Sequence, residues 1–363
     1  MNVQAPEAAA VEARTDRLVA RLAEQGLDCL LVTNLLNVRY LTGFTGTNGA
    51  CIVTPNERLF VTDFRYVEQA EAQVIGYERV EASRDMLGDL AARLRGRAGF
   101  EDADVSVAKH AKLGEKLPSG AELVAAGTLV EELREVKDAS EVAAMRAATE
   151  LADAAYRDMQ ERGLVGRTER EVAITATRAM VDMGAEGPSF PPIVASGAAG
   201  ALPHAMPRDV EIPSGVLVVV DMGAKVDGYC SDCTRTFATG PLDDDAREVY
   251  ELVLRAQEEA LAATREGAEL PAVDGVARAI IEAAGHGERF GHGLGHGVGL
   301  EVHEGPRLAK TATGSLKAGN AVTVEPGVYV PGELGVRIED LVIVTAGEPD
   351  VLTGFPKDLV TTD

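Results

Sequence analysis

The sequence predicts an α/β domain followed by an α+β domain, and three observations support this assignment. The chain has 363 residues, more than one ordinary compact core accommodates. Short apolar runs alternate with helical stretches in its first third, whereas strand-like runs joined by tight turns dominate its last third. Between them, residues 131–141 are charged and contain no apolar run. We therefore expect one domain over residues 1–135 and a second over residues 136–363.

The N-terminal domain opens with an amphipathic pattern at residues 9–25, which predicts a helix. Apolar runs follow at residues 29–33, 50–54 and 58–62, separated by turn-rich and helical stretches. Residues 43–49 are rich in glycine and threonine and predict a loop. This alternation is typical of an α/β domain with a mostly buried sheet.

The C-terminal domain is expected to begin with helices at residues 139–161 and 168–184, each preceded by a capping signature. Two more helices are expected at about residues 242–266 and 271–285, separated by Pro271. Strand-like runs fill the rest. We therefore expect antiparallel hairpins flanked by helices.

The composition excludes several classes of protein. The chain is 46% hydrophobic and 26% charged, as in globular proteins, and its net charge of -23 disfavours nucleic acid and anionic membranes as partners. No window holds the roughly 18 continuous apolar residues of a membrane span, and the N-terminal stretch lacks the apolar core of a signal peptide. Four cysteines are too few for a disulfide scaffold. We expect a cytoplasmic protein.

Five side chains of the type that binds metal ions stand out in the last third of the chain. Four carboxylates and one imidazole, brought together, make a hard site for divalent cations. So much negative charge in one pocket is costly unless cations neutralise it. The five candidates are Asp221, Asp232, His296, Glu325 and Glu339.

The first pair of acids flanks an Asp227-Gly228 turn. A turn centred on Val226-Asp227 places Asp221 opposite Asp232, and one centred on Asp227-Gly228 places them diagonally. Either register leaves both on one face of the hairpin, where a shared cation would remove their repulsion. Two solvated acids are the alternative, although the apolar run before Asp221 favours burial.

Cys230 and Cys233 have the spacing of a redox or zinc motif. In a strand these two positions point to opposite faces, so they cannot hold one ion. We interpret both as small core residues.

Three histidines, His292, His296 and His303, lie within twelve residues among the alternating glycines of residues 291–299. No Gly-Lys-Ser/Thr follows, which excludes a phosphate loop, and the context of a dinucleotide fingerprint is missing. Glycines at this density allow the backbone to approach a crowded site closely. A single histidine would be interpreted as structural, but three on this frame indicate a site.

The second pair of acids, Glu325 and Glu339, is 14 residues apart. A hairpin centred on Gly332 would place them face to face. Arg337 would share that face and could support a ligand carboxylate. An exposed Arg–Glu surface pair is the alternative.

Together these motifs resemble the pita-bread metallopeptidases, in particular the aminopeptidase P and prolidase (Xaa-Pro dipeptidase) branch. The two-aspartate hairpin, HGLGHGVGLEVHE, VTVEPGVY and VRIED occur in the family's order and spacing. NVRYLTGFTGTNG and TDFRYVEQA resemble the branch's companion domain, with Phe64 replacing the family's usual glycine. The resemblance implies a creatinase-like N-terminal domain followed by a pita-bread catalytic domain.

The resemblance also implies two divalent metal ions. Asp221 would bind one ion, and Asp232 and Glu339 would bridge the pair. His296 and Glu325 would complete the other ion, and Glu325 would also shuttle protons. A water between the ions would be the nucleophile. One histidine and four carboxylates favour Mn2+, with Co2+ or Zn2+ as alternatives.

Three histidines, His204, His292 and His303, match family positions that would donate hydrogen bonds to the substrate and to the developing oxyanion. Tyr329 and Arg337 match supporting positions. Such sites cleave the bond between an N-terminal residue and a following proline in short peptides, a bond that ordinary peptidase grooves reject.

Several alternatives remain open at this point. A methionine-aminopeptidase-like enzyme shares the metal fold, a creatinase-like hydrolase shares both domains, and a non-catalytic peptide-binding relative would have lost the ligands. A dipeptidase also needs a cation for the substrate carboxylate, for which Arg39 and Arg208 are candidates, although each also fits an ordinary structural arginine. We expect a homodimer whose partner domain lines the pocket.

Overall fold

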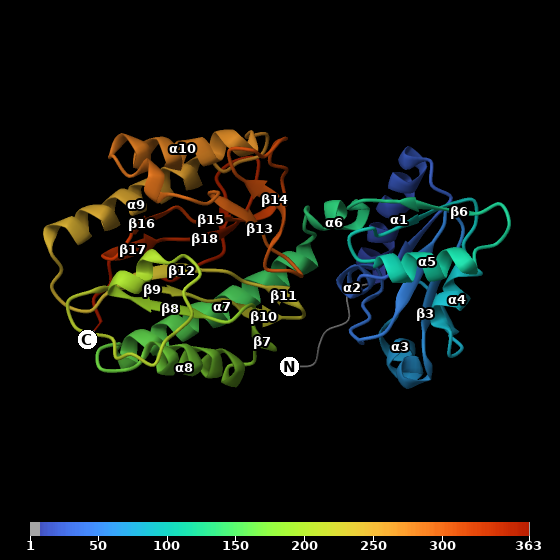
Figure 1. The fold of residues 1–363 in the computed structure, drawn as a ribbon, viewed down its shortest axis with the longest axis horizontal. Helices are drawn as coiled ribbons and strands as arrows, with labels where there is room; N and C mark the ends of the chain where they lie inside the picture. Colours follow the sequence, from blue (N-terminus) through green and yellow to red (C-terminus); the bar gives the residue numbers. More distant parts are fainter. Residues whose placement is uncertain (1–7, 363) are drawn as a thin grey trace. The chain divides into compact units, whose positions relative to one another are not determined.

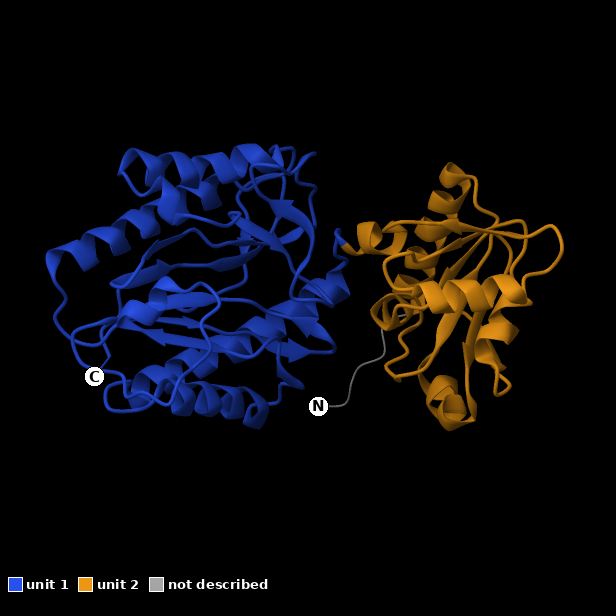
Figure 2. Ribbon diagram, viewed as in Figure 1, with its two compact units in different colours: residues 1, 135–363 blue, residues 2–134 orange. Residues whose placement is uncertain are grey.

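The computed structural model describes residues 8–362. Residues 1–7, the start of the N-terminal stretch considered above, lie outside that range. The chain divides between Arg134 and Glu135 into two compact units (Figure 2). Helix α1 (Ala8–Gln25) confirms the helix predicted at residues 9–25.

The N-terminal unit is built on a six-stranded sheet in the order β4-β3-β2-β1-β5-β6. The three predicted apolar runs form its central antiparallel strands, whereas β4, β5 and β6 join by parallel pairing. The strands are β1 (Cys29–Val32), β2 (Ala50–Val53), β3 (Arg58–Thr62), β4 (Glu78–Glu81), β5 (Arg97–Phe100) and β6 (Glu122–Ala125). Five further helices are α2 (Leu35–Thr42), α3 (Val67–Gln73), α4 (Met86–Ala91), α5 (Val107–Glu115) and α6 (Leu129–Arg134).

A buried carboxylate joins two elements of this unit. Glu101, just after β5, accepts hydrogen bonds from the main-chain N–H groups of Thr33 (2.6 Å) and Asn34 (2.8 Å) and from Nδ2 of Asn37 (2.6 Å). These donors lie at the start of α2. Burial nevertheless raises the pKa of Glu101 to about 7, because it outweighs these hydrogen bonds.

Four long helices of the C-terminal unit confirm the four predicted ones: α7 (Ala139–Arg162), α8 (Glu169–Asp182), α9 (Asp244–Ala263) and α10 (Leu270–Ala283). Capping boxes fix the starts of α7 and α8. As predicted, Pro271 marks the start of the second of the two later helices. It lies in the first turn of α10, where the missing N–H of proline has no helical partner to lose.

The strands of the C-terminal unit pair antiparallel, as the sequence predicted for an α+β domain. They are β7 (Gly187–Pro188), β8 (Ile193–Ser196), β9 (Leu217–Asp221), β10 (Ala224–Val226), β11 (Tyr229–Cys230), β12 (Thr234–Ala238), β13 (Gly295–Gly297), β14 (Glu304–Leu308), β15 (Ala321–Val324), β16 (Gly327–Val330), β17 (Leu334–Arg337), β18 (Asp340–Ile343) and β19 (Asp350–Val351).

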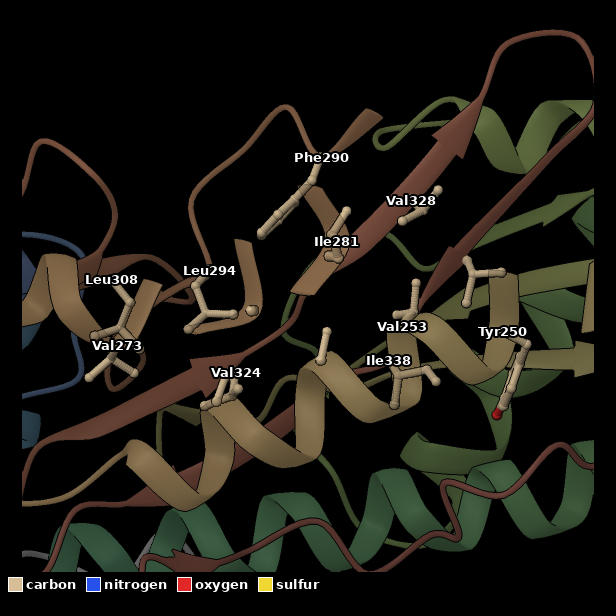
Figure 3. Close-up of a cluster of buried hydrophobic side chains, with 14 of the residues drawn as sticks. Tyr250, Val253, Val273, Ile281, Phe290, Leu294, Leu308, Val324, Val328 and Ile338 are labelled. Atoms are coloured by element: carbon tan, nitrogen blue, oxygen red, sulfur yellow. The ribbon is translucent and has the colours of Figure 1, made fainter. Parts of the chain in front are cut away.

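Helices cover these strands from two sides (Figure 1). α7 and α8 pack on β8, β9 and β12 through one apolar core, whereas α9 and α10 pack on β14 to β18 through another. Figure 3 shows the second core, in which Val253 of α9 and Ile281 of α10 face Val324, Val328 and Ile338. The two helix pairs thereby bury apolar side chains of the strands that carry the acids.

The first hairpin adopts the Asp227-Gly228 register. Val226 pairs with Tyr229, and Asp227 (φ 46°) and Gly228 (φ 76°) both adopt left-handed conformations, which a type I′ turn requires. The same register pairs Asp221 with Thr234, so Asp232 lies diagonal to Asp221.

The second hairpin turns at Gly332, as predicted. Val324 pairs with Asp340 and Gly327 pairs with Arg337, and each pair of residue numbers adds up to twice 332. Glu325 therefore lies opposite Glu339, as the sequence predicted.

None of the helices within residues 8–362 combines the length and apolar character that a membrane span requires.

Candidate active site

A pocket of about 840 Å3 lies in the C-terminal unit. Its wall includes every site residue that the sequence predicted: His204, Asp221, Asp232, His292, His296, His303, Glu325, Tyr329, Arg337 and Glu339. These side chains come from positions more than 130 residues apart along the chain, counting from His204 to Glu339.

Carboxylate and imidazole atoms crowd together at the base of this pocket. One ligand atom from each of Asp232, His296 and Glu339 lies within 4.8 Å of the others. Nε2 of His296 lies 3.1 Å from Oε1 of Glu325 and 3.7 Å from Oδ2 of Asp232. This spacing allows several side chains to share a cation.

Two buried oxygens in the cluster have no hydrogen-bond partner within the described part of the chain, namely Oδ1 of Asp221 and Oε1 of Glu339. An unsatisfied buried carboxylate oxygen is costly, whereas a divalent cation is a natural partner for it. The donor set therefore fits hard divalent metal ions.

The acids also perturb one another. Burial and the neighbouring carboxylates Glu339 and Asp221 raise the pKa of Asp232 well above its ordinary value. Burial and the same kind of repulsion raise the pKa of Glu339. Burial also acts on Glu325, but the hydrogen bond from His296 outweighs it and lowers the pKa to about 2.

The orientation of His296 is set by its own strand. Nδ1 donates to the carbonyl oxygen of Gly297 (3.0 Å), so Nε2 faces the acids. Burial acts to lower the pKa of His296, but the hydrogen bond to Glu325 outweighs burial and raises it to about 9, so Nε2 also carries a proton until a metal ion replaces it. A Cβ at Gly295 would collide with the carbonyl oxygen of Thr323, and one at Gly297 with that of Gly305. The glycine frame thus allows the close approach that the sequence predicted.

Arg337 donates to Asp221, a carboxylate of the other hairpin, and forms no hydrogen bond with the nearby Glu339 within the described residues. Its NH2 group donates to Oδ2 of Asp221 at 2.7 Å, and its Nε donates to Oγ1 of Thr234 at 2.9 Å. Thr234 in turn donates to Oε2 of Glu339 at 2.7 Å. The sequence analysis missed Thr234, which a β-strand register alone could have placed opposite Asp221.

His292 is engaged on both sides. Its Nδ1 donates to the carbonyl oxygen of Gly293 (2.7 Å), and its Nε2 lies 2.9 Å from the hydroxyl of Tyr329. That hydroxyl accepts a hydrogen bond from Arg337 and so donates its own proton to Nε2. In this arrangement His292 cannot donate to a substrate, so its expected role needs revision.

His204 and His303 are exposed at the pocket and free to face a ligand. The rings of His303 and His296 have centroids 4.4 Å apart. Burial, followed by the positive charge of His296, lowers the pKa of His303. An exposed imidazole that lines the pocket can donate a hydrogen bond to a ligand or accept one from it.

Of the arginines proposed as carboxylate anchors, Arg208 is not available. Its side chain forms a 2.6 Å ion pair with the buried Glu169. This agrees with the alternative interpretation of Arg208 as a structural arginine. Arg39 belongs to the N-terminal unit. Arg307, which the sequence analysis missed, lines the pocket on β14 in register with His296.

Cys230 and Cys233 are both buried free thiols with different neighbours, the carbonyl oxygens of Leu300 and Glu339 respectively. This agrees with their interpretation as small core residues.

Comparisons with known proteins give the family. Residues 143–346 match Metallopeptidase family M24, and residues 14–136 match the Creatinase/Prolidase N-terminal domain. The chain belongs to metallopeptidase family M24. Within this family it falls in the prolidase branch, which confirms the resemblance seen in the sequence and the predicted order of the two folds.

Relatives match over nearly the whole chain. An uncharacterized peptidase of Bacillus subtilis, YqhT, is 38% identical over 96% of this chain and 99% of its own. The Xaa-Pro dipeptidase of Pyrococcus furiosus is 34% identical over 96% of this chain and 99% of its own.

Solved structures of related peptidases have the same fold as this chain. The Xaa-Pro dipeptidase from Bacillus anthracis has a TM-score of 0.94 at 39% identity, covering 97% of this chain and 99% of that one. The X-Pro aminopeptidase from Thermotoga maritima has a TM-score of 0.89 at 33% identity, covering 96% and 100%. This M24 chain is a peptidase, and membership of a metallopeptidase family implies that it uses divalent metal ions.

Proposed function

We propose that this chain hydrolyses the Xaa-Pro bond at the N-terminus of short peptides, using two divalent metal ions. The convergence of four acids and His296 in one pocket, with two buried carboxylate oxygens unpartnered within residues 8–362, carries this proposal. Xaa-Pro peptidases among the similar proteins support the choice of substrate.

The metal ions would be held by Asp221, Asp232, His296, Glu325 and Glu339. Bound divalent ions would supply a water of lowered pKa and polarise the scissile carbonyl. One imidazole and four carboxylates favour Mn2+, with Co2+ or Zn2+ as alternatives.

Protein groups around the cluster have separate roles in this proposal. Glu325 acts as the proton shuttle for the attacking water, because its carboxylate lies within the metal cluster, opposite Glu339 and 3.1 Å from Nε2 of His296. His204 and His303 hydrogen-bond the substrate carbonyl and the oxyanion. His292, engaged with Tyr329, positions that tyrosine and Arg337 rather than contacting the substrate.

Dipeptides are the substrates that we favour, because the pocket carries an available cation. Arg307 is exposed at the pocket and forms no ion pair within residues 8–362. A guanidinium there can bind the free carboxylate of the substrate's second residue. A longer peptide lacks that carboxylate at the same position.

The substrate proposal is tested by three rates measured with Mn2+ present: a Xaa-Pro dipeptide, a Xaa-Pro tripeptide and a Met-Ala peptide. We expect the dipeptide to be cleaved fastest. Preference for the tripeptide would indicate an aminopeptidase P, and preference for Met-Ala would indicate a methionine-aminopeptidase-like enzyme. No cleavage, together with no Mn2+ binding, would favour a non-catalytic peptide-binding relative.

Arg307→Met should raise the KM for a Xaa-Pro dipeptide about 10- to 100-fold, the effect of losing one charge-assisted hydrogen bond. KM for the corresponding Xaa-Pro amide, which has no carboxylate, should not change. Arg289→Met is the matched control, because Arg289 also lines the pocket but donates to His286. Equal losses on the dipeptide and the amide would contradict the anchoring role.

A homodimer in the cytoplasm, in which the partner's N-terminal domain lines the pocket, completes the proposal. All four cysteines are free thiols, as in proteins of reducing compartments. Light scattering tests the assembly, and a fully active monomer would refute it.

A further inference from the structure

The carboxylate of Glu169, at the first turn of α8, accepts five hydrogen bonds from two residues. Oε1 accepts from the N–H (2.9 Å) and hydroxyl (2.7 Å) of Ser196 and from NH2 of Arg208 (2.6 Å). Oε2 accepts from the N–H (3.0 Å) and Nε (2.8 Å) of Arg208. The Glu169 side chain is fully buried, whereas that of Arg208 is 47% exposed.

Ser196 and Arg208 are the two ends of one segment, residues 197–207, which we name the His204 loop. β8 ends at Ser196, and the loop leaves the sheet there. Because a single carboxylate bonds both ends, it closes the loop at its base. The main chain adds one more tie, from the N–H of Arg170 to the carbonyl oxygen of Arg208 (3.1 Å).

Apolar packing contributes little to the position of this loop. Its small core consists of Ala195, Ala199 and Ala205, with Ile193 alongside. Leu202 is 62% exposed and Met206 is 70% exposed. Alanine methyl groups bury little surface, so polar contacts and close main-chain packing contribute more to the position of the loop than apolar side chains do.

Arg337 connects the part of the loop next to His204 to a carboxylate of the candidate metal site. NH1 of Arg337 donates to the carbonyl oxygen of Pro203 (3.2 Å), next to His204, while NH2 of the same arginine holds Asp221. Gly335 packs so closely on Gly200 that a Cβ there would collide with the Gly200 carbonyl. The loop is thus fixed at its base by Glu169 and on its inner side by β17.

We propose that Glu169 and Arg208 form a positioning pair that sets the distance of His204 from the substrate. Neither residue lines the pocket, so the pair acts through the loop. The kinetic consequence rests on the proposed function, whereas the mechanical consequence does not.

Hydrogen exchange of the full-length protein tests the mechanical part. Glu169→Gln places an amide N–H2 against the donors of Arg208 and should speed exchange of the amides in residues 197–207 at least about 10-fold. Glu171→Gln is the matched control, because Glu171 caps the same helix through the N–H of Thr168 and does not contact the loop. Equal exchange in Glu169→Gln and wild type, or the same acceleration in Glu171→Gln, overturns the proposal.

Kinetics separate positioning from mere stability. KM for a Xaa-Pro dipeptide should rise about 10- to 100-fold in Glu169→Gln with a smaller change in kcat and unchanged Mn2+ affinity by calorimetry. In a His204→Ala background the same substitution should add little, because the loop then carries no substrate contact. A full additive loss in that background overturns the role through His204.

Arg208→Gln opens the same pair from its exposed side and serves where Glu169→Gln fails to fold. It should reproduce both effects. A wild-type enzyme that binds Mn2+ but cleaves no Xaa-Pro peptide would refute the proposed function, and the exchange measurement would still decide the positioning pair.

Discussion

Each buried acid of the site has different neighbours, and those neighbours separate their chemistry. Asp221 is paired with Arg337, Glu325 contacts His296, and Glu339 receives the Thr234 hydroxyl. Burial and three carboxylate neighbours, Glu339, Asp221 and Glu325, raise the pKa of Asp232, whereas Nε2 of His296 lies 3.7 Å from Oδ2 of Asp232. Its negative charge is therefore the one most dependent on a cation.

Asp232→Asn should reduce kcat/KM at least about 100-fold and abolish tight Mn2+ binding, since even residues behind a ligand can contribute that much. The metal-free protein should remain folded and should not lose thermal stability, because one of the mutually repelling charges is removed. Activity, calorimetry and thermal unfolding of the metal-free form measure these effects.

Asp227→Asn is the matched control in the same hairpin, because asparagine also tolerates the left-handed conformation of that turn. It should retain metal binding and activity. Substantial activity in Asp232→Asn would contradict the bridging role.

At the scale of elements, the glycines of strand β13 allow its main chain to lie closer to neighbouring carbonyl oxygens than a side chain would permit. Gly295 and Gly297 flank His296, and both approach neighbouring carbonyl oxygens too closely for a side chain. His296 is thereby held between β14 and β15 with its Nε2 toward the acids.

Gly295→Ala should destabilise the C-terminal unit by about 2–3 kcal/mol and weaken Mn2+ binding, because the added methyl group displaces β13 from Thr323. Gly291→Ala, in the same glycine-rich segment, has open space around its Cβ and should change neither property. Urea unfolding and calorimetry measure both. Identical behaviour of the two variants would refute the close-approach explanation.

The joint between β5 and α2 should give the N-terminal unit a distinctive pH dependence. The pKa of Glu101 rises from 4.5 to about 7 on folding, so the folded state binds the extra proton between these values. The contribution of Glu101 to stability is then largest below about pH 4.5 and falls by about 3 kcal/mol as pH rises to 7. Above pH 7 it is constant.

Urea unfolding of this unit at several pH values measures the slope, which Glu101→Gln should flatten. Glu122→Gln, at an exposed position of β6, should leave the slope unchanged. A slope that persists in Glu101→Gln would assign the dependence to other groups.

At the scale of the whole molecule, the metal site belongs to one unit only. Every residue that lines the pocket lies in the C-terminal unit. Of the strands next to the acids, β9 and β12 pack on α7 and α8, and β15 and β18 pack on α9 and α10. Metal binding should therefore stabilise that unit selectively.

Mn2+ at about 100 times its Kd should stabilise the C-terminal unit by about 2.7 kcal/mol, and EDTA should reverse this. The effect should diminish at acidic pH, because metal ligands must be deprotonated. Hydrogen exchange with and without Mn2+ locates the stabilisation. Equal protection of β1 to β3 and of the pocket strands would contradict it.

Much of this architecture was accessible from the sequence, because its signals are local. The 3.6-residue pattern and the capping signatures before both helices predicted α7 and α8, and two-residue periodicity placed each acid pair on one face. The short helices α2 to α6 have six to nine residues, too few for a repeated 3.6-residue pattern, although N-cap side chains begin three of them, at Asn34, Asp85 and Ser106. Pro271 marked the start of α10, because the first turn of a helix does not use the N–H that proline lacks.

The sequence by itself determined which residue types form the site and which of them pair, since strand alternation and turn position are properties of neighbouring residues. Only the tertiary structure decided their partners: Arg337 holds Asp221 across 116 residues, Tyr329 occupies His292, and Glu169 fixes the loop of His204. These contacts join elements from different parts of the chain. Their geometry depends on how the helices pack the sheets together, which no local pattern encodes.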